Sequence, residues 1–168
     1  MICRMDALDR RILAELQRNG RVSNVELARA VGLSPSPCLR RLRRLEDEGI
    51  IRGYSAVLDR PAVGLGLTVF IDLRVEPHSE QTAAGLEKAV GELSEVVACH
   101  MVSGSADFHL EVVVSDLAHY ERLLMQSLLA LPAVTDVRSS FAIRCMKADG
   151  PLPLRAPPAP RRRQRYPG

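Results

Sequence analysis

The chain of 168 residues has no tryptophan and only three phenylalanines and three tyrosines, so its core must consist of aliphatic side chains. No apolar run approaches the roughly 20 residues of a membrane-spanning helix, and the start, MICRMDALDRR, lacks the apolar segment of a secretory signal. We therefore expect a cytoplasmic protein with no membrane partner. The four cysteines, at positions 3, 38, 99 and 145, form no CxxC pair and are expected to be reduced thiols.

Charge is unevenly distributed along the chain. The overall net charge is only +3, but residues 1–60 carry +4, residues 61–145 carry −6 and residues 146–168 carry +5. A basic head on an acidic body indicates separate partners for separate parts of the chain, and the partner expected for the head is a polyanion.

Three helices are predicted in the first 50 residues. The first has a helical apolar stripe and ends at Gly20, and the second starts with the capping box SNVE at residues 23–26 and ends at Gly32. The third follows after a turn of about three residues and ends at Gly49. Two helices joined so tightly must cross at a steep angle, which is the helix-turn-helix arrangement.

The third helix, within LSPSPCLRRLRRLEDEG, combines an apolar face with a basic one. Ser34 is the predicted N-cap, and Pro35 and Pro37 lie in the first turn, where backbone N–H groups have no helical partner. The apolar face comprises Cys38, Leu39, Leu42 and Leu45, and the polar face Ser36, Arg40, Arg43, Arg44 and Asp47.

Alone, such a charge run also fits a solvated surface helix, but the preceding helix favours DNA. The second helix of a helix-turn-helix lies in the major groove, where arginine contacts guanine or phosphate. The predicted DNA-binding residues are Ser34, Ser36, Pro37, Arg40, Arg41, Arg43 and Arg44. Of these, Ser36, Pro37 and Arg40 are expected near base edges, and Arg41, Arg43 and Arg44 mostly on phosphates.

The remaining sequence changes period repeatedly. IIRGYSAVLD indicates a strand pair or wing, and residues 67–146 then alternate as strand, helix, strand, strand, helix, strand. This βαββαβ order predicts an α+β protein: a winged helix-turn-helix domain followed by a ferredoxin-like domain with helices on one face of an antiparallel sheet. We expect an apolar open face of that sheet, covered by a second copy. A dimer also suits DNA, because two reading helices match two half-sites.

The expected organisation is a DNA-binding domain at 1–52, a strand and linker at 53–66, a ferredoxin-like domain at 67–146 and a disordered tail at 147–168. The tail holds six of the eleven prolines and the run RRRQR, which either adds nonspecific attraction to DNA or is merely solvated.

Two stretches resemble the Lrp/AsnC family of transcriptional regulators: NVELARAVGLSPSPCLRRLRRLEDEGIIRGYSAVLD and VACHMVSGSADFHLEV. The resemblance spans about residues 6–146. It implies a sequence-specific DNA-binding regulator that responds to a small amino-acid effector, controls amino-acid metabolism or transport genes, and assembles as a homodimer and further to an octamer. No cofactor besides the effector is implied.

The family's effector site lies at a subunit interface. By motif position, the resemblance carries it to Ser103, Gly104, Asp107, Ser139, Ser140 and Phe141. Serine hydroxyls and loop N–H groups suit a carboxylate, and Asp107 suits an ammonium group. The sequence has Ser105 and Ala106 where the family more often has an acid and an aromatic residue. The alternative interpretation of this loop is a hairpin turn with no ligand, in which Asp107 caps the chain.

Two rival functions remain at this stage. One is an enzyme on the same architecture, with His100 beside His109 or Glu111 as a metal pair; alternation along a strand keeps Cys99 away from His100, so we predict no metal site and no catalytic residue. The other is a nucleoid-structuring protein that binds DNA broadly through charge. A nucleoid-associated location fits both DNA-binding interpretations.

Overall fold

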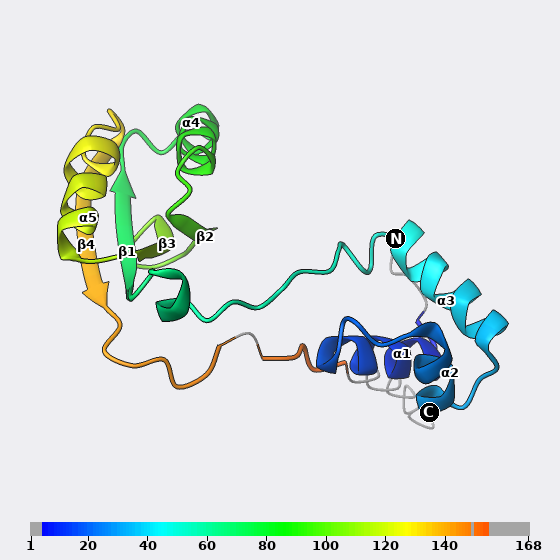
Figure 1. Ribbon diagram of the computed structural model, residues 1–168. Helices are drawn as coiled ribbons and strands as arrows, with labels where there is room; N and C mark the ends of the chain where they lie inside the picture. Colours follow the sequence, from blue (N-terminus) through cyan, green and yellow to red (C-terminus); the bar gives the residue numbers. More distant parts are fainter. Residues whose placement is uncertain (1–4, 149, 155–168) are drawn as a thin grey trace, which may run out of the picture. The chain divides into compact units, whose positions relative to one another are not determined.

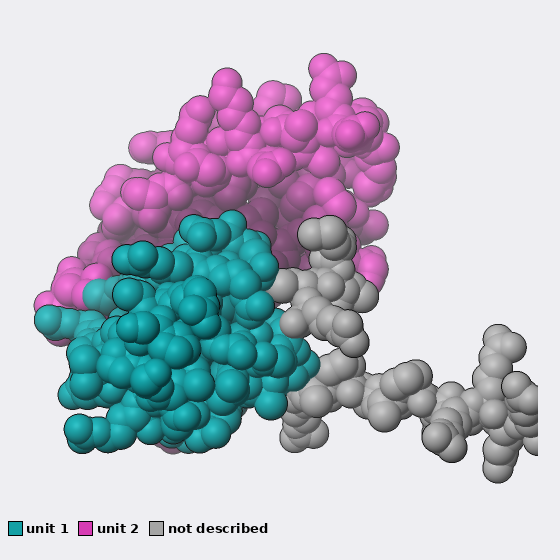
Figure 2. Space-filling view, turned by 90° about the vertical axis from the view of Figure 1, so that its right-hand side faces the viewer, with its two compact units in different colours: residues 1–56, 147–168 teal, residues 57–146 magenta. Residues whose placement is uncertain are grey.

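The computed structural model describes residues 5–148 and 150–154, which form two compact units (Figures 1 and 2). The first unit comprises Met1–Ala56 together with Lys147–Gly168, and the second comprises Val57–Met146.

The described residues of the first unit form three helices, α1 (Ala7–Arg18), α2 (Asn24–Val31) and α3 (Pro35–Asp47). Their core is aliphatic and includes Ile12, Leu27 and Leu45, each at most 1% exposed. The predicted apolar stripes account for this packing, since helical periodicity places these side chains on facing surfaces. Helix α1 ends earlier than expected, at the C-cap Asn19 in extended conformation, so Gly20 is not its cap.

The second unit is a four-stranded antiparallel sheet with helices on one face. It consists of a 3₁₀ turn η1 (Pro61–Val63), then β1 (Leu67–Val75), α4 (Glu80–Gly91), β2 (Val96–Met101), β3 (Phe108–Val114), α5 (Leu117–Leu123), a π-helical continuation η2 (Leu124–Leu128) and β4 (Val134–Phe141). The strand order is β2-β3-β1-β4. The predicted βαββαβ arrangement is therefore confirmed.

The core of this unit lies between the sheet and its helices. Alternate residues of β1, namely Val69, Ile71 and Leu73, are completely buried there, against Leu86 of α4 and Leu128 of η2. A strand places successive side chains on opposite faces, so the residues between them lie on the open face.

That open face is not the apolar surface expected from the sequence. It presents Thr68, Phe70, Asp72 and Arg74 from β1, together with His109 and Glu111 from β3 and Arg138 from β4. His109 Nδ1 lies 2.7 Å from Asp72 Oδ1, and Arg60 Nη1 lies 2.8 Å from Glu111 Oε1. Apart from Val113, which pairs with Thr68, the valines and leucines of β1, β3 and β4 point to the helices instead. The open face is therefore mostly polar, and the argument for a dimer from an apolar sheet face is wrong.

The expected strand pair or wing after Gly49 is also absent from the described residues. Residues 52–59 are exposed and form no helix or strand. Tyr54 anchors this stretch to α3, because its hydroxyl donates to Glu46 Oε1 at 2.8 Å. Burial and this carboxylate raise the pKa of Tyr54 to about 12.

The tail differs from its prediction as well. Residues 150–154 return to the first unit, where Leu154 packs against the helical core and Leu152 is bonded to Gln17. Residues 150–154 therefore have defined contacts, and the prediction of a disordered tail is wrong for this short stretch. The run RRRQR at 161–165 lies outside the described residues.

Candidate nucleic-acid interface and effector site

Helix α3 is placed by a tight connection to α2. Gly32 ends α2 in the left-handed region (φ 75°), where a side chain would be strained, and Leu33 N–H donates to Ala28 O at 2.8 Å. Asn24 Nδ2, in the first turn of α2, donates to the carbonyl of Pro35 at 2.9 Å. The start of α3 is thus fixed at both ends of α2, as a helix-turn-helix requires.

The capping box predicted at the start of α2 is present. Glu26 N–H donates to Ser23 Oγ, and Ser23 N–H donates to Glu26 Oε2 at 3.0 Å. Hydrogen bonds from the Ser23 hydroxyl and N–H lower the pKa of Glu26. The box thus satisfies the backbone N–H groups of Ser23 and Glu26 without using any residue of α3.

The N-terminus of α3 remains open to a ligand. Ser34 occupies the N-cap and Pro35 the first helical position, as predicted, but the Ser34 side chain makes no capping hydrogen bond. Ser34 and Ser36 are exposed, and Pro37 is partly exposed. Cys38 faces inward, where burial raises the pKa of its thiol. The hydroxyls of Ser34 and Ser36, together with the backbone N–H of Ser36, suit a DNA phosphate at this end.

The four arginines of α3 divide into two pairs. Arg41 Nη1 lies 2.6 Å from Asp6 Oδ2 and 2.9 Å from Asp9 Oδ1, and Arg44 Nη2 lies 2.6 Å from Asp9 Oδ2. The Asp9 side chain is 1% exposed, so its charge is neutralised by these two arginines rather than by water. Arg41 and Arg44 therefore hold α1 to α3, a role that the phosphate assignment from sequence did not include.

Electrostatics agree with this arrangement. A hydrogen bond from the Asp9 N–H, followed by one from Arg41, lowers the pKa of Asp6. Hydrogen bonds to Asp6 and Asp9 raise the pKa of Arg41, and the bond to Asp9 raises that of Arg44. Asp6, Arg41 and Arg44 therefore remain ionised at neutral pH.

Arg40 and Arg43 form the other pair. Both are exposed, and within the described residues neither makes an ion pair. They line a shallow surface hollow of about 420 Å³ together with Ser36, Leu39, Arg44 and Asp47. Arg40 and Arg43 are thus the arginines of this outward surface that hold no carboxylate, with Ser36 one turn nearer the N-terminus.

Asp107 of the predicted effector site is already engaged within the chain. Its carboxylate accepts a hydrogen bond from Val75 N–H at 2.9 Å and lies 3.0 Å from His78 Nε2. The first of these bonds, and then His78, lower the pKa of Asp107. Asp107 therefore joins β3 to the end of β1, close to the capping interpretation of this loop. His78 was not singled out from the sequence, since an isolated histidine in a loop carries no pattern.

The other candidate effector residues lie apart. Ser103 and Gly104 are exposed in the β2–β3 loop, near the Leu73 end of β1, whereas Phe141 pairs with Val69. Val69 and Leu73 are four residues apart, about 13 Å along the strand. A single chain therefore does not bring the loop residues and the end of β4 into one site.

The three residues of β4 also divide between the two faces. Ser139 and Phe141 are on the helix side, where the Ser139 hydroxyl is bonded to the Tyr120 hydroxyl and the Phe141 ring meets the Tyr120 ring edge-on. Ser140 pairs with Phe70 and lies on the open face. Phe141 is 45% exposed and borders a pocket of about 540 Å³ lined also by Gly66, Leu67, Ser115, Asp116 and Leu117.

The histidines of the hairpin form no metal cluster in the part of the chain that the structure describes. His100 lies opposite His109 across the strands, which is one of the two pairings considered from the sequence. His109, however, is hydrogen-bonded to Asp72 and stacks on Phe70. No helix among the described residues has both the length and the apolar character for crossing a membrane.

The geometry describes a DNA-binding module of three helices joined in sequence to a ferredoxin-like domain. Residues 5–52 match the winged helix-turn-helix DNA-binding family, and residues 68–152 match the Lrp/AsnC ligand binding domain. The protein is thus a DNA-binding regulator with a ligand-binding domain. It belongs to the Lrp/AsnC family of transcriptional regulators.

Relatives and solved structures agree. The chain is 41% identical over 151 residues to the leucine-responsive regulatory proteins of Klebsiella pneumoniae and Escherichia coli K12, covering 90% of this chain and 92% of each relative. A transcriptional regulator of Neisseria meningitidis, solved as its complex with L-Met, is 39% identical with a TM-score of 0.85. An AsnC family regulator of Agrobacterium tumefaciens is 38% identical with a TM-score of 0.84; in both, 89% of this chain and 97% of the other are covered.

Proposed function

We propose that this regulator binds specific operators through Ser34, Ser36, Pro37, Arg40 and Arg43 at the exposed surface of α3. The division of the arginines supports the proposal. Arg41 and Arg44 are held by carboxylates of α1, and they orient a helix on which Arg40 and Arg43 remain available. An arginine held on a rigid helix can donate two hydrogen bonds to a guanine edge.

The assignment of Arg41 and Arg44 to phosphates changes in this proposal. Arg44 is 44% exposed and Arg41 27%, so each retains N–H groups on its water side that can approach a phosphate without leaving Asp9. Their primary role is to orient α3, and their phosphate contacts are secondary. No residue is given a catalytic role.

The effector proposed here is an apolar L-amino acid. The relatives named as leucine-responsive and the Neisseria complex with L-Met support this class of ligand. The pocket beside Phe141 is lined mainly by apolar groups, which suits an apolar side chain. We propose that the loop residues Ser103, Gly104 and Asp107 complete the site from a second copy, because one chain keeps them apart.

A homodimer, and an octamer built from dimers, is part of the same proposal. Support comes from exposed apolar side chains outside the sheet face, including Val57 at 78%, Ile143 at 102% and Met146 at 84%. Burial of such groups against a second copy is favourable. The target genes proposed are those of amino-acid metabolism or transport, and the location proposed is the cytoplasm, in association with the nucleoid.

The specificity ratio at fixed salt tests the DNA part. The dissociation constant for the protein's own upstream region is compared with that for a shuffled fragment of equal length and composition. A regulator should prefer an operator by about 10³ or more. Equal affinity for both fragments, and for a panel of genomic fragments, would instead identify a nucleoid-structuring protein.

A ligand screen tests the effector part. The melting temperature of the protein is measured with each of the twenty amino acids, because a ligand that binds only the folded state raises it. We expect the largest increases with L-leucine or L-methionine. An increase with a charged amino acid alone would contradict the proposed apolar pocket.

A further inference from the structure

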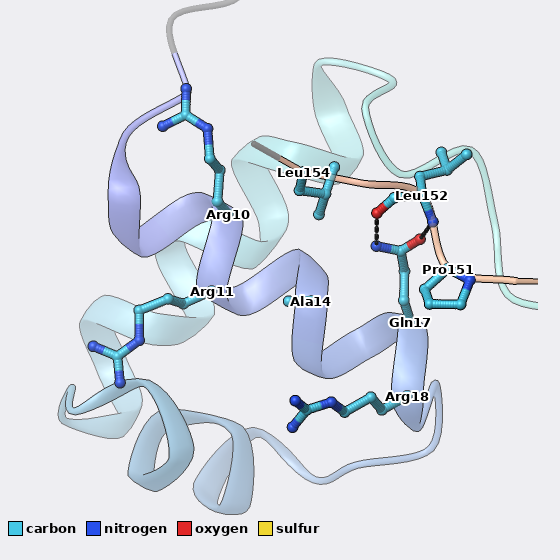
Figure 3. Close-up of a pocket in the computed structure, with 8 residues that line it drawn as sticks. All are labelled: Arg10, Arg11, Ala14, Gln17, Arg18, Pro151, Leu152 and Leu154. Atoms are coloured by element: carbon cyan, nitrogen blue, oxygen red, sulfur yellow. Dashed lines mark hydrogen bonds between the residues drawn. The ribbon is translucent and has the colours of Figure 1, made fainter. Parts of the chain in front are cut away.

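Residues 150–154, here called the strap, are hydrogen-bonded to helix α1 through the side chain of Gln17. The amide of Gln17 makes two hydrogen bonds with one residue: Leu152 N–H donates to Gln17 Oε1 at 2.5 Å, and Gln17 Nε2 donates to Leu152 O at 3.3 Å. Figure 3 shows the Gln17 amide facing the backbone of Leu152 from the last turn of α1. The side-chain amide of Gln17 thus bonds both backbone groups of Leu152, as the backbone of a neighbouring strand would.

Side chains of the strap add an apolar contact. Leu154 packs against the helical core, whereas the Leu152 side chain is 71% exposed. Pro151, Leu152 and Leu154 line a groove of about 410 Å³ with Ala14 and Gln17 of α1 and the stems of three arginines, Arg10, Arg11 and Arg18. Backbone pairing at one residue and burial two residues later is how extended peptides dock on protein surfaces.

The other end of α1 carries the carboxylates that hold α3. Gln17 lies eight residues after Asp9, about 12 Å along the same helix. Asp9 is buried between Arg41 and Arg44, so a change in the seating of α1 changes the position of the α3 arginines. A continuous set of contacts therefore runs from the strap through α1 to α3.

We propose that the strap is a positioning element for DNA binding: held by Gln17 and Leu154, it seats α1, and α1 orients α3 through Asp9. The effect of the strap on DNA affinity can be measured only if the proposed DNA-binding function holds, so this inference rests on the proposed function. The strap begins only eight residues, 142–149, after the end of β4. The last strand of the ligand-binding domain is therefore covalently joined to the DNA-binding unit through a segment with its own docking site, in addition to the exposed connection at residues 52–59.

Two truncations separate the strap from the basic tail. A chain of residues 1–156 retains the strap and loses RRRQR, and a chain of residues 1–146 loses both. Each is made with and without Gln17→Ala, and dissociation constants for the protein's own upstream region are measured at one salt concentration. Gln81→Ala is the matched control. Gln81 is an exposed glutamine of α4, in the other unit, and its side chain makes no hydrogen bond with the described residues.

We expect the 1–146 chain to bind about three- to tenfold more weakly than the 1–156 chain, as loss of two hydrogen bonds and one apolar contact implies. Gln17→Ala should weaken the 1–156 chain about threefold and leave the 1–146 chain unchanged, because Gln17 then has nothing to hold. Equal binding by both truncations overturns the proposal. So does an equal effect of Gln17→Ala in both, which would give Gln17 a role independent of the strap.

Amide hydrogen exchange in α1 provides a readout that does not need DNA. The residues 13–18 should exchange faster in the 1–146 chain and in Gln17→Ala than in the 1–156 chain. If no chain binds any fragment, the proposed function fails and exchange alone decides on the strap: unchanged exchange overturns it. Should the 1–146 chain not fold, Leu154→Ser in the 1–156 chain replaces it, with the same expected directions.

Discussion

Asp9 Oδ2 of α1 lies 2.6 Å from Arg44 Nη2 of α3, and the Asp9 side chain is almost completely buried. A carboxylate at such a position needs a cationic partner, because burial without one carries a large desolvation penalty. The pair therefore fixes two helices of the DNA-binding unit relative to each other. Some arginines of α3 therefore stabilise the packing of the helices, whatever contacts they also make with DNA.

We predict that Asp9→Ala destabilises the DNA-binding unit. The substitution leaves Arg41 and Arg44 without their shared partner, but both can reach water, so the free energy of unfolding should fall by about 1–3 kcal/mol. Chemical denaturation monitored by circular dichroism measures it. Glu15→Ala, which removes a surface pair with Arg18, should change stability by less than about 0.5 kcal/mol. Similar effects of the two substitutions would contradict the assignment.

Arg40→Ala should weaken binding to the preferred operator by about 1–3 kcal/mol and relax base choice at one position, because a base contact is lost. Competition with operator variants at fixed salt measures this. Arg43→Ala is the comparison, since it removes an equal charge from the same face; it should weaken binding to all sequences alike. Uniform weakening by Arg40→Ala would assign that residue to a phosphate.

Asp107 is predicted to act in both the fold and the effector response. Asp107→Ala should abolish the change in DNA affinity caused by L-leucine or L-methionine and leave affinity without amino acid nearly intact. His78→Ala, which removes only the ring beside Asp107, should lower the melting temperature and retain the response. A normal response from Asp107→Ala would show that the ligand does not contact this loop.

Acid should destabilise the first unit through Asp6. Its pKa is lower in the folded chain than its ordinary value near 3.8, so the ionised form stabilises the fold above that value. This contribution is lost as the pH falls below about 4 through the folded pKa. We expect Asp6→Asn to reduce stability at pH 7 and to have a smaller effect at pH 2, because the folded-state carboxylate is progressively protonated as the pH falls. An unchanged difference between pH 7 and pH 2 would show that the Asp6 carboxylate is not the titrating group.

Much of the fold follows from local patterns. Capping boxes, apolar periodicity and the alternation of strand and helix depend on residues close in sequence, so Ser23, Gly32 and the βαββαβ order were predictable. The open face of the sheet was not, because valine-rich strands do not reveal which of their two faces meets the helices. Register decided it, and placed Asp72 and His109 outside.

The candidate site shows the same division. Periodicity placed Arg40 and Arg43 on the outer face of α3, and the short turn after Gly32 identified the helix that carries them. Nothing local indicates that Arg41 and Arg44 bind carboxylates 32 to 35 residues earlier, or that Gln17 holds Leu152 at a separation of 135 residues. These partners meet only when helices pack and the chain returns to α1.

The amino-acid sequence by itself determined the class of protein, because the helix-turn-helix spacing, its basic outer face and the order of later elements are written in short-range patterns. Tertiary structure decided which arginines remain available, which face of the sheet is polar and where the chain beyond β4 docks. Side-chain charge and hydrogen-bonding groups are visible in sequence, but their partners are set by packing across distant segments.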